Sequence, residues 1–190
     1  MEKFKTCCFT GHRPSKLPWG FAESDPRCQQ IKAQMASTLD TLYQKGFRTF
    51  ISGMALGADL YFAEAVLDLA ARRPDVQLEG AVPCRSQADR WPEPQRRRWR
   101  SLLNRCHIET LVQECYDRQC MYRRDRYMVD RSSAILALFD GSQGGTQYTL
   151  NYAASRHLSI ILLDPHRPQQ SPLWLEAPSS LVLSAIPAEG

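Results

Sequence analysis

The sequence predicts an α/β fold: a Rossmann-like three-layer sandwich with a mostly parallel sheet of five to six strands and helices on both faces. Short apolar runs alternate with segments of helical periodicity along most of the 190 residues. Glycine-rich segments at 52–59 and 140–146 each follow an apolar run and precede a helical pattern. Strands that alternate with helices form parallel sheets, because right-handed crossovers bring the chain back to the same side of the sheet.

The first half of the chain contains two strand–helix pairs. Residues 3–9 alternate loosely between apolar and polar side chains and are expected as the first strand. A helix is expected over 25–44, where apolar residues recur every three or four positions until a glycine follows. A short buried strand is then expected over 47–51. The next helix covers 58–71, and a proline shortly after it prevents its continuation.

Two further pairs follow. The apolar run 76–82 is expected as a strand that a proline closes, and a proline-rich loop comes next. Helical periodicity then indicates a helix over 95–104, a strand is expected over 106–112, and a second helix is expected over 118–131.

The last strands complete the predicted domain. Residues 134–139 are expected as the fifth strand, a helix is expected over 145–156 after the second glycine segment, and 158–163 is expected as the final strand. Pro, Gln and Ser become frequent after that point. We therefore expect one Rossmann-like domain over 1–165 and a loosely packed C-terminal tail over 166–190.

Composition and charge limit the classes of protein. The net charge of +4 is modest, but the segment 85–131 holds twelve Arg and no Lys against seven acidic residues. Arginine binds phosphates through a bidentate fork, although such a segment is also typical of a solvated helical face. The seven cysteines show no disulfide framework, and no apolar run is long enough to span a bilayer. We expect a cytoplasmic protein with reduced cysteines, no metal site and no required cofactor.

Three loops are expected at one edge of the sheet, because ligands of parallel sheets bind outside the carboxyl ends of the strands. Glycine lets a ligand approach the backbone, and the start of a helix offers unpaired N–H groups and a positive dipole end. The candidate ligand-binding residues are Gly11, His12, Arg13, Ser52, Gly53, Gly57, Asp59, Arg124, Asp140, Gly141, Ser142, Gly144, Gly145 and Thr146.

These candidates have expected roles. The backbone of 140–146, with the hydroxyl of Thr146, is expected to surround a phosphate, and 52–57 plays a similar part at the neighbouring helix. Asp59 is expected to bind a ribose hydroxyl. His12 is expected to hydrogen-bond a base or phosphate, and Arg13 to hold a phosphate.

Structural alternatives remain open for each of them. The glycines fit tight strand–helix turns, Thr146 fits a helix cap, and a carboxylate such as Asp59 is favoured by the helix dipole without any ligand. Arg124 lies at the border of a helical face that holds Asp125. It therefore either contacts a phosphate or sugar from a network with Asp125 or forms a structural ion pair with it.

Three motifs carry a family resemblance: TGHRP after the first strand, SGMALGAD after the second, and MVDRSSAILALFDGSQGGTQYTLNYA near the last helix. In this order, and over roughly 3–164, they resemble the YpsA/YoqJ-like family of bacterial and prophage proteins. That family belongs to the SLOG superfamily, which joins the DNA-processing protein DprA (Smf) with the Lonely-guy phosphoribohydrolases. The resemblance implies a Rossmann-like SLOG domain.

The resemblance to DprA-like proteins implies one function, the binding of single-stranded DNA. They carry an RNR element, and the segment 124–128 resembles it with Asp125 where Asn is usual. They also carry an SGxAxGxD loop, which matches Ser52, Gly53, Ala55, Gly57 and Asp59.

The resemblance to Lonely-guy enzymes implies another function, the hydrolysis of the N-glycosidic bond of a nucleoside monophosphate. They use a PGGxGTxxE loop and an upstream arginine. The segment 144–146 resembles the core of that loop, but Thr149 stands where the catalytic Glu would be.

The residues and the resemblance together favour binding of a nucleotide or nucleotide-derived small molecule, such as an adenosine phosphate, ADP-ribose or an NAD-like compound. An enzyme that cleaves an N-glycosidic or phosphoester bond is an alternative, with Asp59, Asp125 or Asp140 as its carboxylate. Binding of single-stranded DNA ranks third; its candidate surface is Trp91 and Trp99 with the arginines of 96–100. A homodimer is expected only by analogy with other proteins of this fold.

Overall fold

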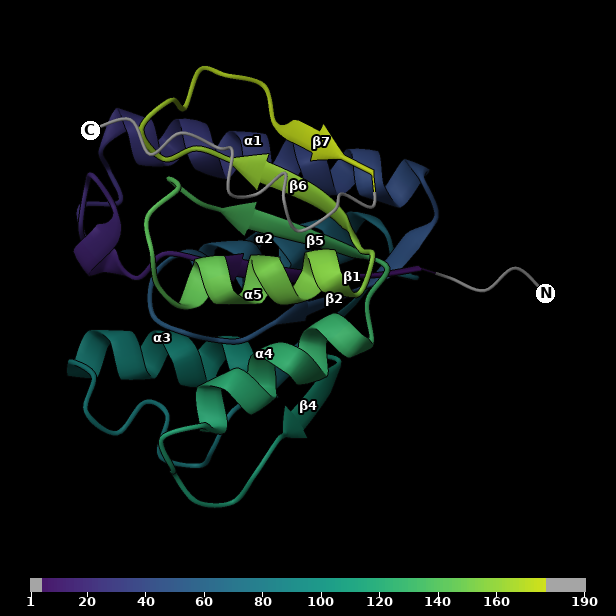
Figure 1. Ribbon diagram of the computed structural model, residues 1–190. Coiled ribbons are helices and arrows are strands. Elements are labelled where there is room, and N and C mark those ends of the chain that lie inside the picture. Colours follow the sequence, from purple (N-terminus) through teal and green to yellow (C-terminus); the bar gives the residue numbers. More distant parts are fainter. Residues whose placement is uncertain (1–4, 177–190) are drawn as a thin grey trace.

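The computed structural model describes residues 5–176, and its central feature is one seven-stranded sheet between two layers of helices (Figure 1). The strand order is β4-β3-β2-β1-β5-β6-β7, parallel throughout except for β7, which runs antiparallel to β6. The strands are β1 (Lys5–Gly11), β2 (Phe47–Ser52), β3 (Gln77–Val82), β4 (Ile108–Leu111), β5 (Ala134–Leu138), β6 (Ser159–Leu163) and β7 (Leu173–Leu175).

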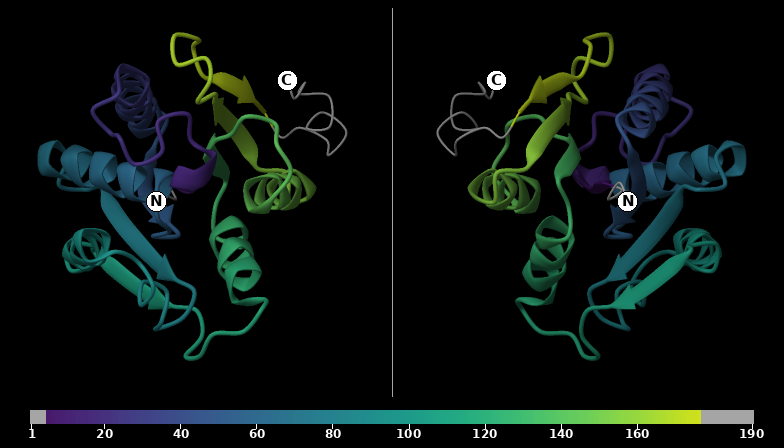
Figure 2. Two further views of the ribbon diagram at one scale, coloured as in Figure 1. Left: turned by 90° about the vertical axis from the view of Figure 1, so that its left-hand side faces the viewer. Right: turned by 90° about the vertical axis from the view of Figure 1, so that its right-hand side faces the viewer.

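The helices cover both faces of the sheet, as the predicted three-layer sandwich requires. In Figure 2, α1, α2 and α3 lie on one side, and α4 and α5 lie on the other. A short 3-10 helix, η1 (Pro14–Lys16), follows β1. The α-helices are α1 (Pro26–Gln44), α2 (Ala58–Arg72), α3 (Glu93–Leu103), α4 (Cys120–Asp130) and α5 (Gly145–Ser155).

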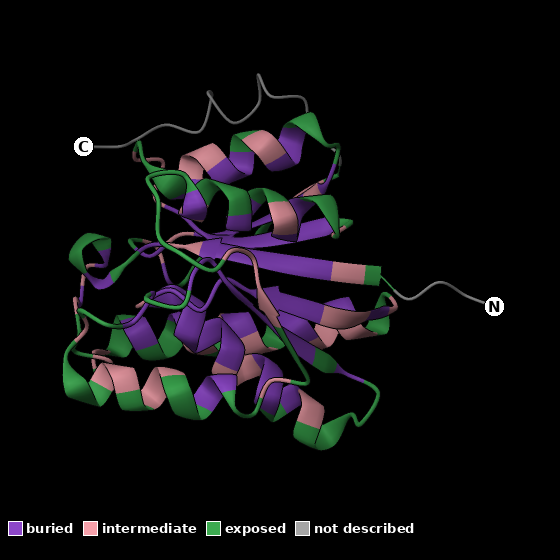
Figure 3. Cartoon of the chain, turned by 90° about the horizontal axis from the view of Figure 1, so that it is seen from below, coloured by how far each residue is buried: buried purple, intermediate pink, exposed green. Residues whose placement is uncertain are grey.

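The core consists of two hydrophobic clusters, one on each face of the sheet. The larger cluster includes Phe9, Phe50 and Phe62 and packs beneath α1 and α2, while Met128 and Leu150 belong to the smaller cluster beneath α4 and α5. Buried residues therefore concentrate in the strands and on the inner faces of the helices (Figure 3). This burial is the expected source of most of the fold's stability.

The sheet register brings the predicted loops together. β1 is the central strand and pairs with β2 on one side and with β5 on the other. Gly11, the last residue of β1, lies opposite Leu138, the last residue of β5. The loops that follow β1, β2 and β5 therefore start side by side at the carboxyl edge of the sheet.

The predicted elements are all present, with boundaries shifted by a few residues, but the sheet has one strand more than predicted. The prediction of a loosely packed tail after residue 165 is wrong for Leu173–Leu175, which forms β7 on the edge of β6. A three-residue strand carries too little periodicity to be recognised in a sequence, and only the exposed edge of β6 makes it form. Residues 1–4 and 177–190 of the predicted strand and tail lie outside the described part of the chain.

Two further findings concern the whole described chain. None of its helices is long and apolar enough to cross a membrane. All seven cysteines fall within the described residues, and each of them is a free thiol.

Candidate functional site

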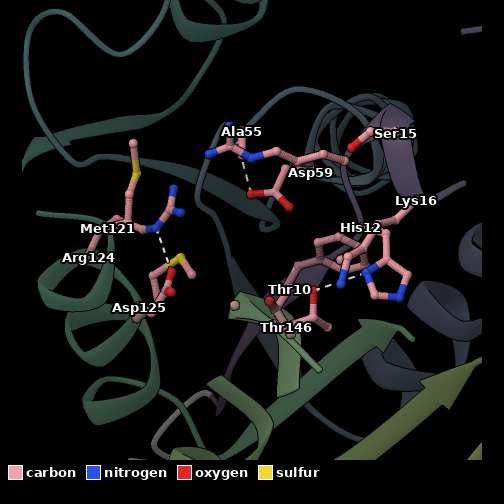
Figure 4. A pocket seen from close by; sticks show the side chains of 16 residues that line it. Thr10, His12, Ser15, Lys16, Ala55, Asp59, Met121, Arg124, Asp125 and Thr146 are labelled. Carbon is pink, nitrogen blue, oxygen red and sulfur yellow. Dashed lines mark hydrogen bonds and ion pairs between the residues drawn. The ribbon is translucent and has the colours of Figure 1, made fainter. Parts of the chain in front are cut away.

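A cavity of about 250 Å³ opens at the carboxyl edge of the sheet. The end of β1, η1, α4 and the first turns of α2 and α5 all contribute to its wall. In Figure 4, His12 and Thr146 lie on one side, Arg124 and Asp125 lie on the other, and Asp59 lies between them. Residues from four separate parts of the sequence thus face one space.

His12 links the loop after β1 to the loop before α5. Its Nε2 lies 2.7 Å from Oδ1 of Asp140, and its Nδ1 lies 3.5 Å from the hydroxyl of Thr146. Burial lowers the pKa of His12, and this effect exceeds the opposite effect of the Asp140 carboxylate. Burial alone would raise the pKa of Asp140, but hydrogen bonds from Ser142 and His12 lower it to about 2. At neutral pH the pair is therefore a neutral imidazole beside an ionised carboxylate.

The N-terminus of α5 is open. The first hydrogen bond within the helix runs from the N–H of Tyr148 to the carbonyl of Gly144, so the N–H groups before it have no helical partner. No described side chain caps this end. A Cβ atom placed on the exposed Gly145 would meet nothing within 4 Å. An anion can therefore approach this helix end closely.

Lys16 adds a positive charge beside this opening. Its Nζ donates hydrogen bonds to the carbonyl of Gln143 (2.6 Å) and to the hydroxyl of Ser142 (3.3 Å). The ammonium group lies in the wall of the cavity and is solvent-exposed. Arg13, also exposed, contributes a second cation to the same wall.

The N-terminus of α2, in contrast, is closed by the protein itself. The N–H of Ala58 donates to the carbonyl of His12 (3.2 Å), and the N–H of Ala55 donates to Oδ2 of Asp59 (3.2 Å). Gly57 has φ +99°, and a Cβ there would lie 2.8 Å from the carbonyl oxygen of His12. The expected second phosphate-binding helix end is therefore occupied by backbone and side-chain groups.

Buried charges hold this first glycine loop in place. Arg124 donates hydrogen bonds to the carbonyl of Gly53 and to Oδ1 of Asp125 (2.8 Å), and the neighbouring carboxylates raise its pKa despite burial. Burial raises the pKa of Asp59 to about 6, although the charge of Arg124 opposes the rise. Arg124 and Asp59 also line the cavity, so both functions considered for Arg124 are compatible with its position.

The candidate residues divide into two groups. Those behind the wall are Ser52, Gly53, Gly57, Asp140, Gly141 and Ser142, and they shape the loops through turns and hydrogen bonds. Those that line the cavity are Gly11, His12, Arg13, Asp59, Arg124, Gly144, Gly145 and Thr146. Contact of any of these residues with a ligand stays a prediction.

Sequence reasoning missed Lys16 and assigned too little to Asp125. Lys16 lies between the strand expected over 3–9 and the helix expected over 25–44, where no periodicity indicates its direction, and only the turn of η1 directs it back to the cavity. Asp125 accepts a hydrogen bond from Thr149 (3.1 Å) as well as from Arg124. Thr149 is fully buried and connects α5 to α4, which explains a threonine at this position in structural terms.

Comparisons with known proteins agree with this architecture. The family model YpsA, described as the YspA SLOG family, matches residues 7–165. The UPF0398 protein YpsA of Bacillus subtilis is 26% identical over 155 residues, which cover 80% of this chain and 86% of that protein.

Two solved structures show the same fold at low sequence identity. DNA processing protein A (DprA) of Streptococcus pneumoniae has a TM-score of 0.53 at 12% identity over 84% of this chain and 50% of that one. The Helicobacter pylori protein of the same name, whose structure concerns its single-stranded DNA binding mode, has a TM-score of 0.55 at 14% identity over 83% of this chain and 64% of that one.

Proposed function

We propose that this chain, which belongs to the YspA SLOG family, binds a nucleotide or nucleotide-derived small molecule at the carboxyl edge of its sheet. The open N-terminus of α5, which faces a cavity of about 250 Å³, carries this proposal. Phosphate groups bind such helix ends through backbone N–H groups and the helix dipole. In this proposal the site needs no metal or other cofactor.

The cations of the cavity wall support a phosphate at this position. Lys16 is exposed and lies beside the start of α5, where it can reach an anion without losing a buried partner, and Arg13 adds an exposed cation elsewhere in the cavity wall. The empty space beside Gly145 leaves room for phosphate oxygens next to the backbone. The hydroxyl of Thr146 adds a hydrogen-bonding group on the same side.

The other end of the cavity fits a sugar. Among the described contacts, the side-chain carboxylate of Asp59 accepts one hydrogen bond, from the N–H of Ala55 to Oδ2. A ribose hydroxyl is a suitable donor for the other carboxylate oxygen. The volume is below the roughly 300–1,000 Å³ of typical ligand sites. It fits a mononucleotide best, whereas ADP-ribose or an NAD-like compound would extend out of the cavity.

An N-glycosidic hydrolase is the second candidate, and the raised pKa of Asp59, about 6, is the observation that favours it. Carboxylates with such a pKa in a cleft are candidates for proton transfer near neutral pH. Release of free base from nucleoside monophosphates or NAD, lost in Asp59→Asn but retained in Asp68→Asn on the same helix, would support this candidate. Absence of turnover across that panel would exclude it.

The arginines of α3 do not favour a nucleic-acid surface. Arg98 forms ion pairs with Glu23 and Glu64, and Arg96 pairs with Glu93. Trp91 and Trp99 pack against each other at 6.2 Å between ring centroids. Single-stranded DNA therefore ranks below a small nucleotide and serves as one arm of the test.

Thermal unfolding with AMP, ATP, NAD, ADP-ribose and a short DNA single strand tests the proposal. A ligand at a hundredfold excess over its Kd adds about 2.7 kcal/mol, which raises the Tm by several degrees in a domain of this size. Gly145→Val should abolish the shift without lowering the Tm of the free protein, since its side chain meets open space. A shift that survives Gly145→Val would contradict the placement of the phosphate.

Two other expectations stay predictions. A cytoplasmic location fits a nucleotide-binding protein, and fractionation of the native cells would test it. A homodimer would appear as twice the monomer mass of 21.7 kDa in light scattering.

A further inference from the structure

His12 lies between a carboxylate and a hydroxyl at the phosphate end of the cavity. It is 3% exposed, and Thr146 is 7% exposed. The imidazole contacts Asp140 through Nε2 (2.7 Å) and Thr146 through Nδ1 (3.5 Å). Figure 4 shows His12 and Thr146 together at the wall. These contacts restrict where the ring protons of His12 and the hydroxyl proton of Thr146 can lie.

The protonation state of His12 determines what the hydroxyl of Thr146 can do. Nε2 lies 2.7 Å from the carboxylate of Asp140 and 3.4 Å from its N–H, and the shorter contact favours the neutral tautomer in which Nε2 donates to the carboxylate. Nδ1 then accepts the hydroxyl proton of Thr146. The hydroxyl then has only lone pairs to offer a ligand, and lone pairs repel phosphate oxygens. When Nδ1 is protonated, it donates to the oxygen of Thr146, and the hydroxyl proton is free to point into the cavity. Thr146 thereby changes from an acceptor to a donor.

Charged groups around His12 come from several elements. Asp140 lies before α5 and stabilises a protonated ring, whereas Lys16 of η1 and His166 after β6 oppose it. His166 Nε2 lies 3.7 Å from the second oxygen of Asp140. Asp59 of α2 lines the same cavity. Without a ligand, burial and the ammonium group of Lys16 keep His12 neutral, so an additional anion at α5 is what would favour its protonation.

We propose that this subsite selects a terminal phosphate monoester and that binding of the dianion is coupled to uptake of one proton by His12. This inference rests on the nucleotide site proposed above and narrows its ligand to a mononucleotide. Monoesters carry close to two negative charges at neutral pH. The phosphates of a diester or of an internal pyrophosphate carry one charge each, and they stabilise the protonated ring less.

Calorimetric titration of the whole protein with AMP tests the coupling. At pH 7.5, in two buffers with different ionisation enthalpies, the heats should differ by an amount that corresponds to uptake of up to one proton. By linkage, the affinity for AMP should fall by up to about tenfold per pH unit above pH 7, where AMP itself no longer titrates. NAD should bind at least about tenfold more weakly than AMP and without comparable proton uptake, since its phosphates are diesters.

Three variants identify the group that takes up the proton. His12→Gln keeps an amide that can donate to Asp140 but cannot titrate, so proton uptake and the pH dependence should disappear. His166→Gln and Asp59→Asn remove two other titratable groups near the site; the number of protons taken up per AMP bound should be retained in both, even where Asp59→Asn lowers the affinity for AMP. If His12→Gln does not fold, the number of protons that the native protein takes up on binding AMP tests the coupling.

The outcomes separate this inference from the proposed function. AMP binding without proton uptake, uptake that survives His12→Gln, or NAD that binds as tightly as AMP would overturn the inference and leave a nucleotide site in place. Failure of AMP, ATP, NAD and ADP-ribose to bind at all would overturn both.

Discussion

The two glycine loops look alike in the sequence, yet the fold uses them differently. Each follows a strand and precedes a helix, at 52–59 before α2 and at 140–146 before α5. At the first loop, protein groups occupy the position that a ligand would take. Arg124 donates a hydrogen bond to the carbonyl of Gly53, and the carbonyl of His12 accepts one from the start of α2. The second leaves Gly145 beside open space. A glycine loop can therefore admit a ligand only where no neighbouring segment already occupies the helix end.

Arg124→Met should lower the free energy of unfolding most, because it removes the charge that holds the first loop in place. Asp125 and the carbonyl of Gly53 would lose a buried partner, and the free energy of unfolding should fall by about 3–5 kcal/mol in urea denaturation. Arg123→Met is the matched control: its side chain is 49% exposed, and the loss should stay below about 1 kcal/mol. Equal losses in the two variants would contradict a locked first loop.

Gly57→Ala should have the next largest effect. The residue has φ +99°, and the added Cβ would meet the carbonyl oxygen of His12 at 2.8 Å. Strain and overpacking should together cost about 2–3 kcal/mol of unfolding free energy. Gly46→Ala separates the two causes: its φ is +90° but no atom lies within 4 Å, so strain alone acts there. If both variants lose the same stability, the close approach of the two loops has no energetic consequence.

The carboxylates of the two loops should give opposite pH dependences. Asp59 has its pKa raised to about 6, so the folded state binds this proton more tightly than the unfolded state does. Stability should therefore fall by about 2–3 kcal/mol as pH rises from about 4 to 6, and Asp59→Asn should remove this fall.

Asp140, with its pKa lowered to about 2, provides the contrast. Its contribution is present above about pH 4 and is lost as pH falls toward 2, so Asp140→Asn should leave the change between pH 4 and 6 intact. Denaturant unfolding over this pH range measures both effects. A fall between pH 4 and 6 that persists in Asp59→Asn would assign it to another group.

Lys16→Met should have the smallest effect on stability, but it should weaken the binding of AMP. Lys16 is exposed, so stability should change by less than about 0.5 kcal/mol. The Kd for AMP should rise about tenfold, equivalent to about 1.4 kcal/mol. Lys45→Met, which removes an exposed lysine near Trp174 at the opposite edge of the sheet, should leave the Kd unchanged. An unchanged Kd in both variants would remove Lys16 from the site.

Much of the fold was predictable because apolar periodicity reflects burial directly. The run at 134–139 is buried at every position, on both faces of the sheet, which requires a continuous apolar sequence, whereas Arg48 and Thr49 interrupt the run at 47–51 and are only partly buried. β7 was not predictable, because its three residues gain their hydrogen bonds only from β6. The site was predictable in part: parallel strands bring their carboxyl ends to one edge, so His12 and Thr146 could be placed near each other in advance.

The sequence alone determined the order of strands and helices, the parallel sheet and the edge at which the loops meet, since these depend on local periodicity and on the handedness of crossovers. Tertiary structure decided which helix end stays open, that Lys16 turns back to the cavity, and that His12 lies between Asp140 and Thr146. Such features depend on contacts between residues that are distant in the chain, from His12 and Ala58 at the start of α2 to His12 and Thr146 at the start of α5. Local sequence patterns do not indicate such contacts.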